Sequence, residues 1–397
     1  MTTLVALAVF GVVGYRMMSE TQRRRAAHDF LTLAAWLVWR ETPAGTAFRQ
    51  ALRRRTPWIL ATPVLVTINV WLFVLMAQAP GPIAVPETLI EWGGSFGPRT
   101  TNGEWWRLVT ASFVHSRFLA LAVNMIALVQ AGRVLERLVG PLALVVVYVA
   151  AGTFGAVVSL PGHPLAVTAG ASGAVCGVYG LLLATWVRSV FPRSPLTIPF
   201  DVIKAVAPAA AVFVAFNVLA DGLSPAGEAF GLFVGVAAGT ALVRRVSERR
   251  PTANRVGVTF ATSMAIALAA AVPLRGIVDV RPEMRALVAF EDRTAGAYLA
   301  VVNRLRAGGT TDAALVAVIK DQILPELDAA RTSLRALGRV PSQHQPLVDG
   351  AQEYLRLREQ SWHLRLDALN GAGMAKLREA EIRERSALEV IDRLRSA

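Results

Sequence analysis

The sequence predicts an all-α protein that crosses a membrane several times and ends in a helical domain outside the lipid. Of its 397 residues, 54% are hydrophobic and only 17% are charged, and the mean hydropathy is +0.46. An average soluble domain carries about 25% charged residues. Most of the apolar residues gather in runs close to the roughly 20 residues that a helix needs to cross a bilayer. We therefore expect a multi-pass integral protein of the cell membrane.

Seven such runs occur in the first 274 residues. They lie at 57–78, 109–130, 138–160, 170–187, 203–220, 229–243 and 256–274. Arginines cluster in alternate loops, notably at 49–55 and 244–255, and positively charged loops stay on the cytoplasmic side of a membrane. The first run is thus expected to begin in the cytoplasm, which places the C-terminal domain on the extracytoplasmic side.

The net charge of +13 is concentrated in the membrane half of the chain. Residues 1–274 hold 22 Lys and Arg against 11 Asp and Glu, whereas residues 275–397 hold 19 against 17. Because the basic residues lie at the ends of apolar runs, they indicate membrane topology and no nucleic-acid partner. The single cysteine, Cys176, excludes an intrachain disulfide and a cysteine-based metal site. We expect neither a metal nor a cofactor.

Composition and charge also suggest the domain boundaries. Residues 1–56 are expected to form a basic cytoplasmic segment, in which the short apolar stretch 3–15 is a tilted anchor or an interfacial helix. Whether that stretch spans the membrane stays open, and residues 30–39 are expected on the membrane surface. The helical core is expected at 57–243, a basic loop and the seventh span at 244–274, and the extracytoplasmic helical domain at 275–397.

The last 123 residues differ from the rest, since 36 of them are charged. One stripe repeats in steps of three and four, which is typical of an amphipathic helix: Leu377, Ala380, Glu384, Ala387, Ile391 and Leu394. Gly308-Gly309, Pro341 and Gly371-Ala372-Gly373 predict breaks between about four helices. The stripes are most simply core packing, although a binding surface is possible.

Several short motifs follow one another through the core. They are Trp105-Trp106-Arg107-Leu108, residues 110–115 ending in His115, Asn124-Met125, residues 132–136, Gly170-Ala171-Ser172-Gly173, and the series Gly231, Gly235 and Gly239. In this order they resemble the rhomboid family of intramembrane serine proteases. The resemblance covers roughly residues 57–243 and implies a rhomboid-type six-helix core, to which this chain adds a seventh span and the C-terminal domain.

The resemblance also implies a mechanism and a substrate class. Ser172 would be the nucleophile that attacks a peptide bond of a transmembrane protein substrate within the lipid bilayer. Asn124 and the backbone N–H of Ser172 would form the oxyanion site. The resemblance also implies structural roles in the first loop: His115 would form hydrogen bonds, and Trp106 and Arg107 would be interfacial anchors. Small residues would lie at the helix contacts, namely Gly170, Gly173, Gly231 and Gly235.

Three positions depart from the family pattern. Glu228 stands where the family has the histidine that takes the proton from serine, Cys176 where an aromatic residue supports that histidine, and Ala120 where a second histidine contributes to the oxyanion site. Two interpretations follow. The chain is either a serine-type endopeptidase with Glu228 as an unusual base, or a pseudoprotease that binds transmembrane clients without cutting them.

Each candidate residue also has a structural alternative. Ser172 could simply be a small residue at a tight helix contact, and Asn124 could serve only a structural hydrogen bond. Glu228 could be the base, contact a substrate, or be hydrated without a role. His163 could reach Ser172, although its neighbours Gly162 and Pro164 suggest an exposed turn. The identity of substrates or clients, the role of the C-terminal domain and the oligomeric state stay open.

Overall fold

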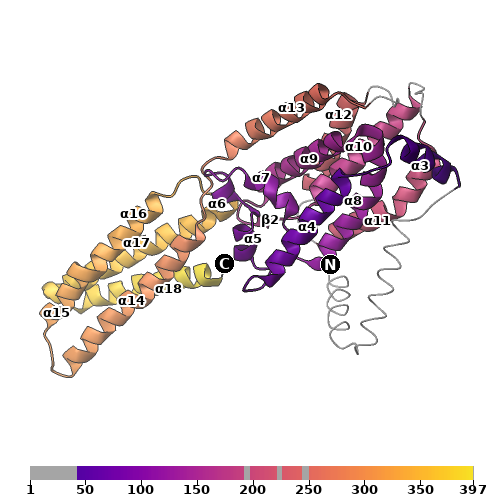
Figure 1. Ribbon diagram of the computed structural model, residues 1–397. Coiled ribbons are helices and arrows are strands. Elements are labelled where there is room, and N and C mark those ends of the chain that lie inside the picture. Colours follow the sequence, from indigo (N-terminus) through magenta and orange to yellow (C-terminus); the bar gives the residue numbers. More distant parts are fainter. Residues whose placement is uncertain (1–42, 192–196, 221–225, 244–249, 397) are drawn as a thin grey trace, which may run out of the picture. The chain divides into compact units, whose positions relative to one another are not determined.

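The computed structural model describes residues 43–191, 197–220, 226–243 and 250–396. By its internal contacts the chain forms two compact units, Met1–Arg275 and Gly276–Ala397 (Figure 1). Both are built mainly of helices. The anchor expected at 3–15 and the interfacial segment expected at 30–39 lie outside the described residues.

Within its described residues, the first unit contains six helices that are long and apolar enough to cross a membrane. They are α4 (Ala61–Gln78), α8 (Phe118–Val139), α9 (Pro141–Gly162), α10 (Ser172–Val190), α11 (Phe200–Ala220) and α13 (Ala253–Ala271). A further apolar helix, α12 (Ala226–Leu242), has 17 residues, which is at the lower limit for a spanning helix of about 17–25 residues. The all-α, multi-pass fold class is confirmed.

Short elements connect or precede these helices. They are α3 (Pro43–Arg55), α5 (Pro86–Glu91), β1 (Ser95–Phe96), α6 (Gly97–Thr100), α7 (Arg107–Thr110), the 3₁₀ turn η1 (Ala111–Phe113), β2 (Val167–Thr168) and the 3₁₀ turn η2 (Val272–Leu274). The two strands pair antiparallel, with Ser95 opposite Thr168 and Phe96 opposite Val167. This pairing joins the loop after α4 to the loop before α10.

The second predicted span, 109–130, is wrong in its position along the chain. The helix is α8, which begins at Phe118, whereas residues 107–113 form α7 and η1. Hydropathy alone missed this because the apolar residues of η1 are held in the fold by a backbone contact: the N–H of Gly170 donates to the carbonyl of Ala111 at 2.9 Å. Arg133 and Arg137 consequently lie in the last two turns of α8.

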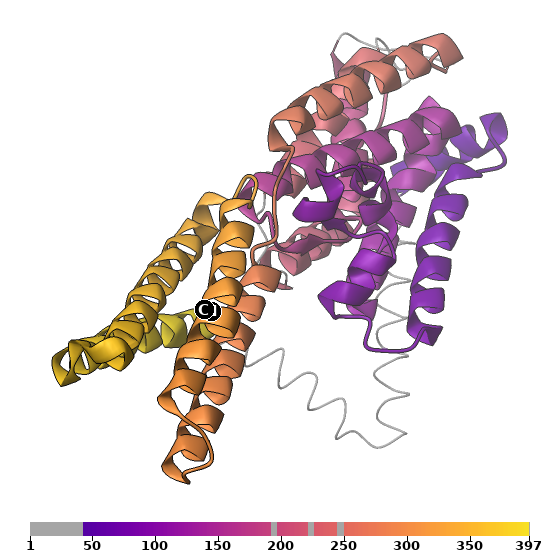
Figure 2. The ribbon, with the colours of Figure 1, turned by 90° about the vertical axis from the view of Figure 1, so that its left-hand side faces the viewer.

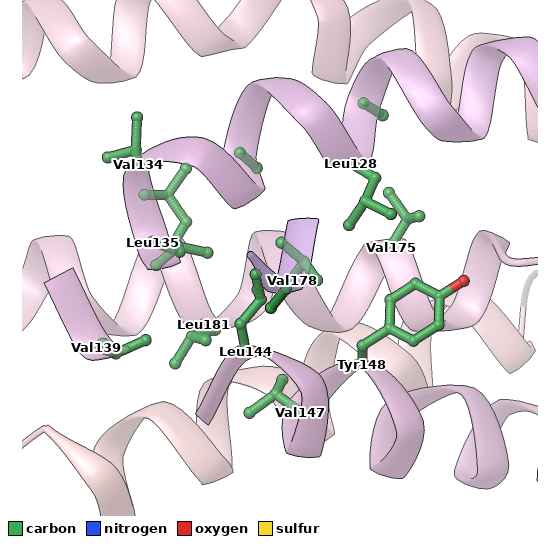
Figure 3. Packing of buried hydrophobic residues seen from close by; sticks show 14 of the residues in the cluster. Leu128, Val134, Leu135, Val139, Leu144, Val147, Tyr148, Val175, Val178 and Leu181 are labelled. Carbon is green, nitrogen blue, oxygen red and sulfur yellow. The ribbon is translucent and has the colours of Figure 1, made fainter. Parts of the chain in front are cut away.

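The helices α8, α9 and α10 share one apolar core. Figure 3 shows Leu135 of α8, Leu144 of α9 and Val178 of α10 directed toward one another, and all three are fully buried. Tyr148 of α9 lies in the same cluster, and its hydroxyl donates to the Ser112 carbonyl at 3.3 Å. This bond links the core to the turn that precedes α8.

The helices α10 and α12 pack backbone against backbone. A Cβ added to Gly231 would lie 2.2 Å from the Gly173 carbonyl oxygen, and one added to Gly235 would lie 2.0 Å from that of Gly177. No side chain fits at such distances, so glycine is required at the contact. The close approach brings together the N-terminal ends of the two helices, where Ser172 and Glu228 lie.

The start of α4 is fixed to α8 by a buried carboxylate. Glu136 accepts hydrogen bonds from the backbone N–H groups of Leu60, Ala61 and Thr62, and from the Thr62 hydroxyl at 2.8 Å. These N–H groups lie at the start of α4, where they have no hydrogen-bond acceptor within the helix. The last membrane helix, α13, runs along the outside of the bundle beside α9 (Figures 1 and 2).

The second unit is a set of amphipathic helices around its own core. Its elements are α14 (Arg281–Arg306), α15 (Asp312–Ala317), the π-helical segment η3 (Val318–Ile323), α16 (Leu324–Arg335), the 3₁₀ turn η4 (Ser342–His344), α17 (Gln345–Asp367), the π-helical segment η5 (Ala368–Ala372) and α18 (Met374–Ser396). The breaks fall at the predicted glycines and proline: Gly308 and Gly371 adopt positive φ angles, and Pro341 precedes η4.

Candidate active site

Ser172 is the first residue of α10, and the loop before it is tightly constrained. The pairing of β1 with β2 holds the loop on one side. Gly170 has a φ of +136°, a conformation that side chains rarely adopt, and its N–H is bonded to Ala111 as described above. The backbone thus fixes the direction in which α10 begins.

The structure places Ser172 and Glu228 in direct contact although 56 residues separate them. The hydroxyl Oγ of Ser172 lies 2.8 Å from the carboxylate Oε1 of Glu228, with the hydroxyl donating. Both side chains are half-buried. The contact depends on the glycine-lined interface of α10 and α12, because a wider helix separation would move the two groups apart.

Helix geometry makes this a favourable place for a negative charge. Ser172 and Glu228 both lie in the first turn of their helices, where backbone N–H groups have no partner within the helix and the helix dipole is positive. A carboxylate near a helix N-terminus is stabilised by roughly 0.3–1 kcal/mol. Two N-termini converge here, which explains physically how a glutamate is accommodated within an apolar bundle.

Two small cavities border Ser172. One, of about 50 Å³, is lined by Glu228 and His163 together with Ser112, Gly155, Ser159 and Gly227, among others. The other, of about 100 Å³, lies toward the start of α8, and its polar lining includes His115, Arg117, Asn124 and Asn217. A polar cavity needs only about 10–15 Å³ to hold a water molecule. Both cavities therefore have room for water beside the serine.

Asn124 is buried on α8 and lines the larger cavity with Ser172. Its side-chain Nδ2 donates to the Ala120 carbonyl at 2.7 Å, and the second hydrogen of that amide remains for another acceptor. Its Oδ1 has no hydrogen-bond partner among the described residues. The structural bond and an oxyanion role are thus compatible in one side chain.

His115 supports the backbone beside the serine. Its Nδ1 lies 3.4 Å from the Phe113 carbonyl, and its Nε2 lies 3.4 Å from the backbone N–H of Ala171, which precedes Ser172. Burial lowers the pKa of His115 from 6.5 to about 4. The ring is therefore neutral at pH 7, which suits a residue that donates at one nitrogen and accepts at the other.

Arg107 differs from the interfacial anchor that the sequence predicts. Its side chain is buried, with 3% exposed, and it donates to the carbonyls of Ile90 and Gly94 and to Glu104. The arginine fork joins three parts of the first loop, and this internal pairing explains its burial. Trp106 is half-exposed beneath it, with the guanidinium carbon 4.6 Å from the ring centre.

Of the three positions that depart from the family pattern, Glu228 carries a carboxylate, and the other two hold small side chains. Ala120 lines the cavity beside Asn124 and offers no side-chain donor. Cys176 lies one turn after Ser172, is buried in the apolar cluster, and is a free thiol. These three positions thus offer a carboxylate, a thiol and a methyl group.

Two further residues complete the surroundings of the serine. His163 is half-buried and lines the smaller cavity, but no hydrogen bond joins its ring to Ser172 or Glu228 in the described part of the chain. Asn217 of α11 lines the larger cavity and donates to the Phe213 carbonyl at 2.8 Å. Sequence reasoning overlooked Asn217. The available signal was an asparagine inside an apolar run, where polar residues are costly.

Within the described ranges, no group of three or more His, Cys, Asp or Glu side chains could hold a metal ion.

Comparison with known proteins gives matches in the same part of the chain. The family model described as "Rhomboid domain" matches residues 102–245. "Rhomboid protease GluP" of Bacillus subtilis (strain 168) is 34% identical over 122 residues, which are 31% of this chain and 24% of that protein. "Rhomboid-like protease 3" of Toxoplasma gondii is 31% identical over 97 residues, which are 24% of this chain and 37% of that protein.

A plant relative matches in the same way. "RHOMBOID-like protein 5" of Arabidopsis thaliana is 38% identical over 85 residues, which are 21% of this chain and 28% of that protein. The chain thus spans less than half the length of each of these relatives. All of the family-matched segment lies in the first unit, and the second unit lies outside it.

Proposed function

Because this chain belongs to the rhomboid family of membrane proteins, we propose that it is a serine-type intramembrane endopeptidase in which Ser172 is the nucleophile and Glu228 is the general base. The observation that carries this proposal is the 2.8 Å hydrogen bond from the Ser172 hydroxyl to the Glu228 carboxylate. Its substrates would be proteins with transmembrane helices, cleaved from within the lipid bilayer.

In the first step, Oγ of Ser172 attacks a peptide carbonyl while its proton passes to Oε1 of Glu228. The negative charge then moves from the carboxylate to the former carbonyl oxygen. A histidine base would instead create a positive and a negative charge from two neutral groups. In an apolar bundle, moving one charge avoids that separation and favours the glutamate.

The oxyanion would be stabilised by the Asn124 amide, the backbone N–H of Ser172 and the N-terminal end of α10. Asn217 borders the same cavity and could add a second amide. Ala120 supplies no donor, and the loss of one oxyanion donor typically costs about 10²–10³ in rate. We therefore expect slower acylation than in a site with a full set of donors.

In the later steps, Glu228 first donates a proton and then accepts another. Protonated Glu228 would return it to the departing amine, and it would then take a proton from a water that enters through the cavity beside it. A free glutamate is a weaker base than a free histidine by about two pKa units, a handicap of about 3 kcal/mol for complete proton transfer. The proposal thus predicts an enzyme that is slow at neutral pH.

A serine-directed fluorophosphonate tests the pair directly, with the full-length protein in detergent. We expect wild-type protein to be labelled, Ser172→Ala to remain unlabelled, and Glu228→Gln to react about 10²–10⁴-fold more slowly because the base is missing. Ser159→Ala is a matched control, since Ser159 lines the same cavity without contacting Glu228. Absence of wild-type labelling, or equal labelling of Glu228→Gln, would contradict the proposal.

The alternative is a pseudoprotease that binds transmembrane clients without cutting them. It is favoured by Ala120 and Cys176, which remove an oxyanion donor and the support for a histidine ring. A discriminating experiment substitutes Glu228→His together with Cys176→Tyr. In the pseudoprotease case this pair of changes should create cleavage that the wild-type protein lacks, whereas an active wild-type enzyme excludes the alternative.

We further propose that the second unit lies outside the cytoplasm. The arginines at 49–55 precede α4, and those at 244–255 lie between α12 and the first turn of α13, so both segments are assigned to the cytoplasmic side. A reporter active only outside the cytoplasm should be active when fused after Ala397. A silent fusion, with activity of the cytoplasmic counterpart, would reverse the orientation and move Ser172 to the opposite side.

A further inference from the structure

The second unit contains a cavity of about 250 Å³ between α14 and α16, which is closed below by Leu355 of α17. Its walls come from positions 283, 286, 287, 290 and 293 of α14 and from positions 326, 329, 330, 333 and 334 of α16. Each set recurs in steps of three and four, so it occupies one face of its helix. The cavity is therefore a groove that runs along two facing helices of the same unit.

The groove exists because the facing positions carry small side chains above an apolar floor. Leu287, Phe290 and Leu334 are buried and form that floor together with Leu355. The small residues around it are Ala286, Ala329, Ala330 and Ser333. Short side chains at these positions leave the space above the floor open. Apolar groups that enter this space would therefore meet a preformed apolar surface.

The two ends of the groove differ in charge. At one end, Nη2 of Arg293 lies 3.3 Å from Oε2 of Glu326, so these two charges compensate each other. At the other end lies Glu283, ten residues earlier on α14, which corresponds to about 15 Å along the helix axis. The lining thus holds two carboxylates and one guanidinium, and its excess negative charge belongs to Glu283.

Glu283 also has an unused acceptor. Its Oε2 is shielded from solvent and has no hydrogen-bond partner in the part of the chain that the structure describes. A shielded polar atom without a partner is unfavourable. The second oxygen belongs to the same carboxylate, and rotation of that group exchanges the two oxygens. A ligand that brings a positively charged donor to this end of the groove would remove the penalty.

We propose that this groove binds an extended segment of a partner protein through one basic residue, a lysine or an arginine, and one apolar residue close to it. The charged group donates to Glu283, because hydrogen bonds between ionised groups are the strong ones. Its aliphatic stem lies along Leu287, and the apolar residue covers Phe290. This inference does not depend on the catalytic proposal.

The dimensions of the groove restrict the segment further. Glu283 and Phe290 are seven residues apart on α14, or about 10 Å, which an extended chain covers in about three residues. The basic and the apolar residue are thus expected two or three positions apart. The volume of about 250 Å³ lies just below the roughly 300–1,000 Å³ of sites for drug-sized ligands. It therefore suits one or two side chains of a segment that continues outside the groove.

The test uses the full-length protein in detergent and measures the fluorescence anisotropy of labelled peptides. Each peptide carries one arginine three positions from one leucine in a glycine–serine sequence, and both orders are made because the groove does not fix the direction. In the matched peptides, citrulline replaces arginine, which removes the charge at nearly constant shape, or alanine replaces leucine. Free arginine amide, used as a competitor, measures binding of the cation alone.

Two pairs of variants test the two parts of the groove. Glu283→Gln removes the charge inside it, and Glu381→Gln makes the same change at an exposed position of α18 outside it. Ala286→Leu fills the groove, whereas Ala289→Leu adds the same side chain at an exposed position of α14 that does not line it.

We expect an arginine–leucine peptide to bind, and its citrulline and alanine counterparts to bind about tenfold more weakly. Glu283→Gln should weaken binding by about tenfold, as expected for the loss of a hydrogen bond between charged groups, and Ala286→Leu should abolish it. Glu381→Gln and Ala289→Leu should bind as wild type does. The proposal would be overturned by absence of binding, by equal binding of the citrulline peptide, by equal effects within either pair of variants, or by free arginine amide binding as tightly as the peptide.

Discussion

The two units of this chain bring their helices together in different ways. In the first unit, α10 and α12 meet through glycine backbones, with no space for a side chain at Gly231 or Gly235. In the second unit, α14, α17 and α18 meet through large side chains, and Tyr354, Arg358 and Trp362 are all fully buried.

We attribute the difference to the solvent that we propose for each unit, lipid around the first and water around the second. Lipid is as apolar as a leucine side chain, so helices in a membrane gain stability from close van der Waals contact between small residues. In water, the burial of large apolar side chains drives the packing. The lesson for function is that the position of Ser172 relative to Glu228 depends on a contact that tolerates no added atom.

The second unit also buries charged side chains in the middle of its helices. In the first unit, the buried charged side chains lie chiefly near helix ends. Arg358 lies between two carboxylates: its Nε and Nη2 each donate to Glu291 at 2.8 Å, and its Nη1 donates to Glu384 at 2.9 Å. Tyr354 donates to Glu291 as well. The network is a specific polar contact within an apolar core, and removing one partner leaves another charge unpaired.

The largest effect is expected from a side chain added between α10 and α12. Gly235→Val would force its Cβ against the Gly177 carbonyl oxygen at 2.0 Å, so we expect a loss of more than about 3 kcal/mol, the upper range of ordinary overpacking. Gly257→Val on α13 is the control, because a Cβ there meets nothing within 4 Å. The thermal unfolding temperature in detergent is the measurement. Equal unfolding temperatures for the two variants would disprove the backbone contact.

The next effect is expected in the second unit, studied as residues 276–397, which we predict to fold alone. Arg358→Met leaves the buried Glu291 with the Tyr354 hydrogen bond but without its counter-charge, and it should cost about 3–5 kcal/mol in urea unfolding. Arg356→Met removes only an exposed ion pair with Glu353 and should change the stability far less, because solvent screens such pairs. Similar losses of stability in both variants would mean that the buried network stabilises the unit no more than an exposed ion pair does. An aggregated wild-type fragment would mean that the unit requires the membrane core.

A smaller effect is expected in the pH dependence of stability, which should differ between the two units. Since burial lowers the pKa of His115 from 6.5 to about 4, the unfolded chain binds the extra proton first, and stability of the first unit falls as pH drops from 6.5 toward 4. Between pH 7 and pH 5 we expect a loss of about 2 kcal/mol, which His115→Asn should abolish. In the second unit, the hydrogen bond from Arg331 lowers the pKa of Glu359.

The stabilisation from Glu359 is therefore present above the ordinary carboxylate range and is lost only as pH falls below it. At pH 5 the first unit should be weakened while the second is not. Thermal unfolding of the full chain and of residues 276–397 at pH 7 and pH 5 checks this. An equal loss in both, or a loss in the first unit that persists in His115→Asn, would contradict the assignment to His115.

Much of this architecture could be predicted from the sequence, because apolar runs, glycines and arginine clusters act locally. The breaks of the second unit follow from Gly308, Pro341 and Gly371. Glu384, a charged residue within an apolar stripe, is explained by its ion pairs with Arg358 and Arg365 on another helix. The start of α8 could not be predicted from hydropathy, because a contact with the loop before Ser172 fixes the preceding turn.

The candidate site shows the same division. The motif around Ser172 and its spacing to Glu228 could be identified in the chain, but the distance between the two side chains depends on the packing of α10 against α12. Asn217 and the buried position of Arg107 were missed, since each is defined by partners far away in sequence. The roles of these residues stay predictions until they are tested by substitution.

The central claim is that Glu228 takes the proton of Ser172. The most direct measurement is the rate of cleavage of a model transmembrane substrate in liposomes for wild type, Glu228→Gln and Ser172→Ala. An amide cannot accept the serine proton, so we expect the wild type to cleave the substrate and Glu228→Gln to be as inactive as Ser172→Ala. Wild-type cleavage that survives Glu228→Gln but is abolished by Ser172→Ala would contradict the account.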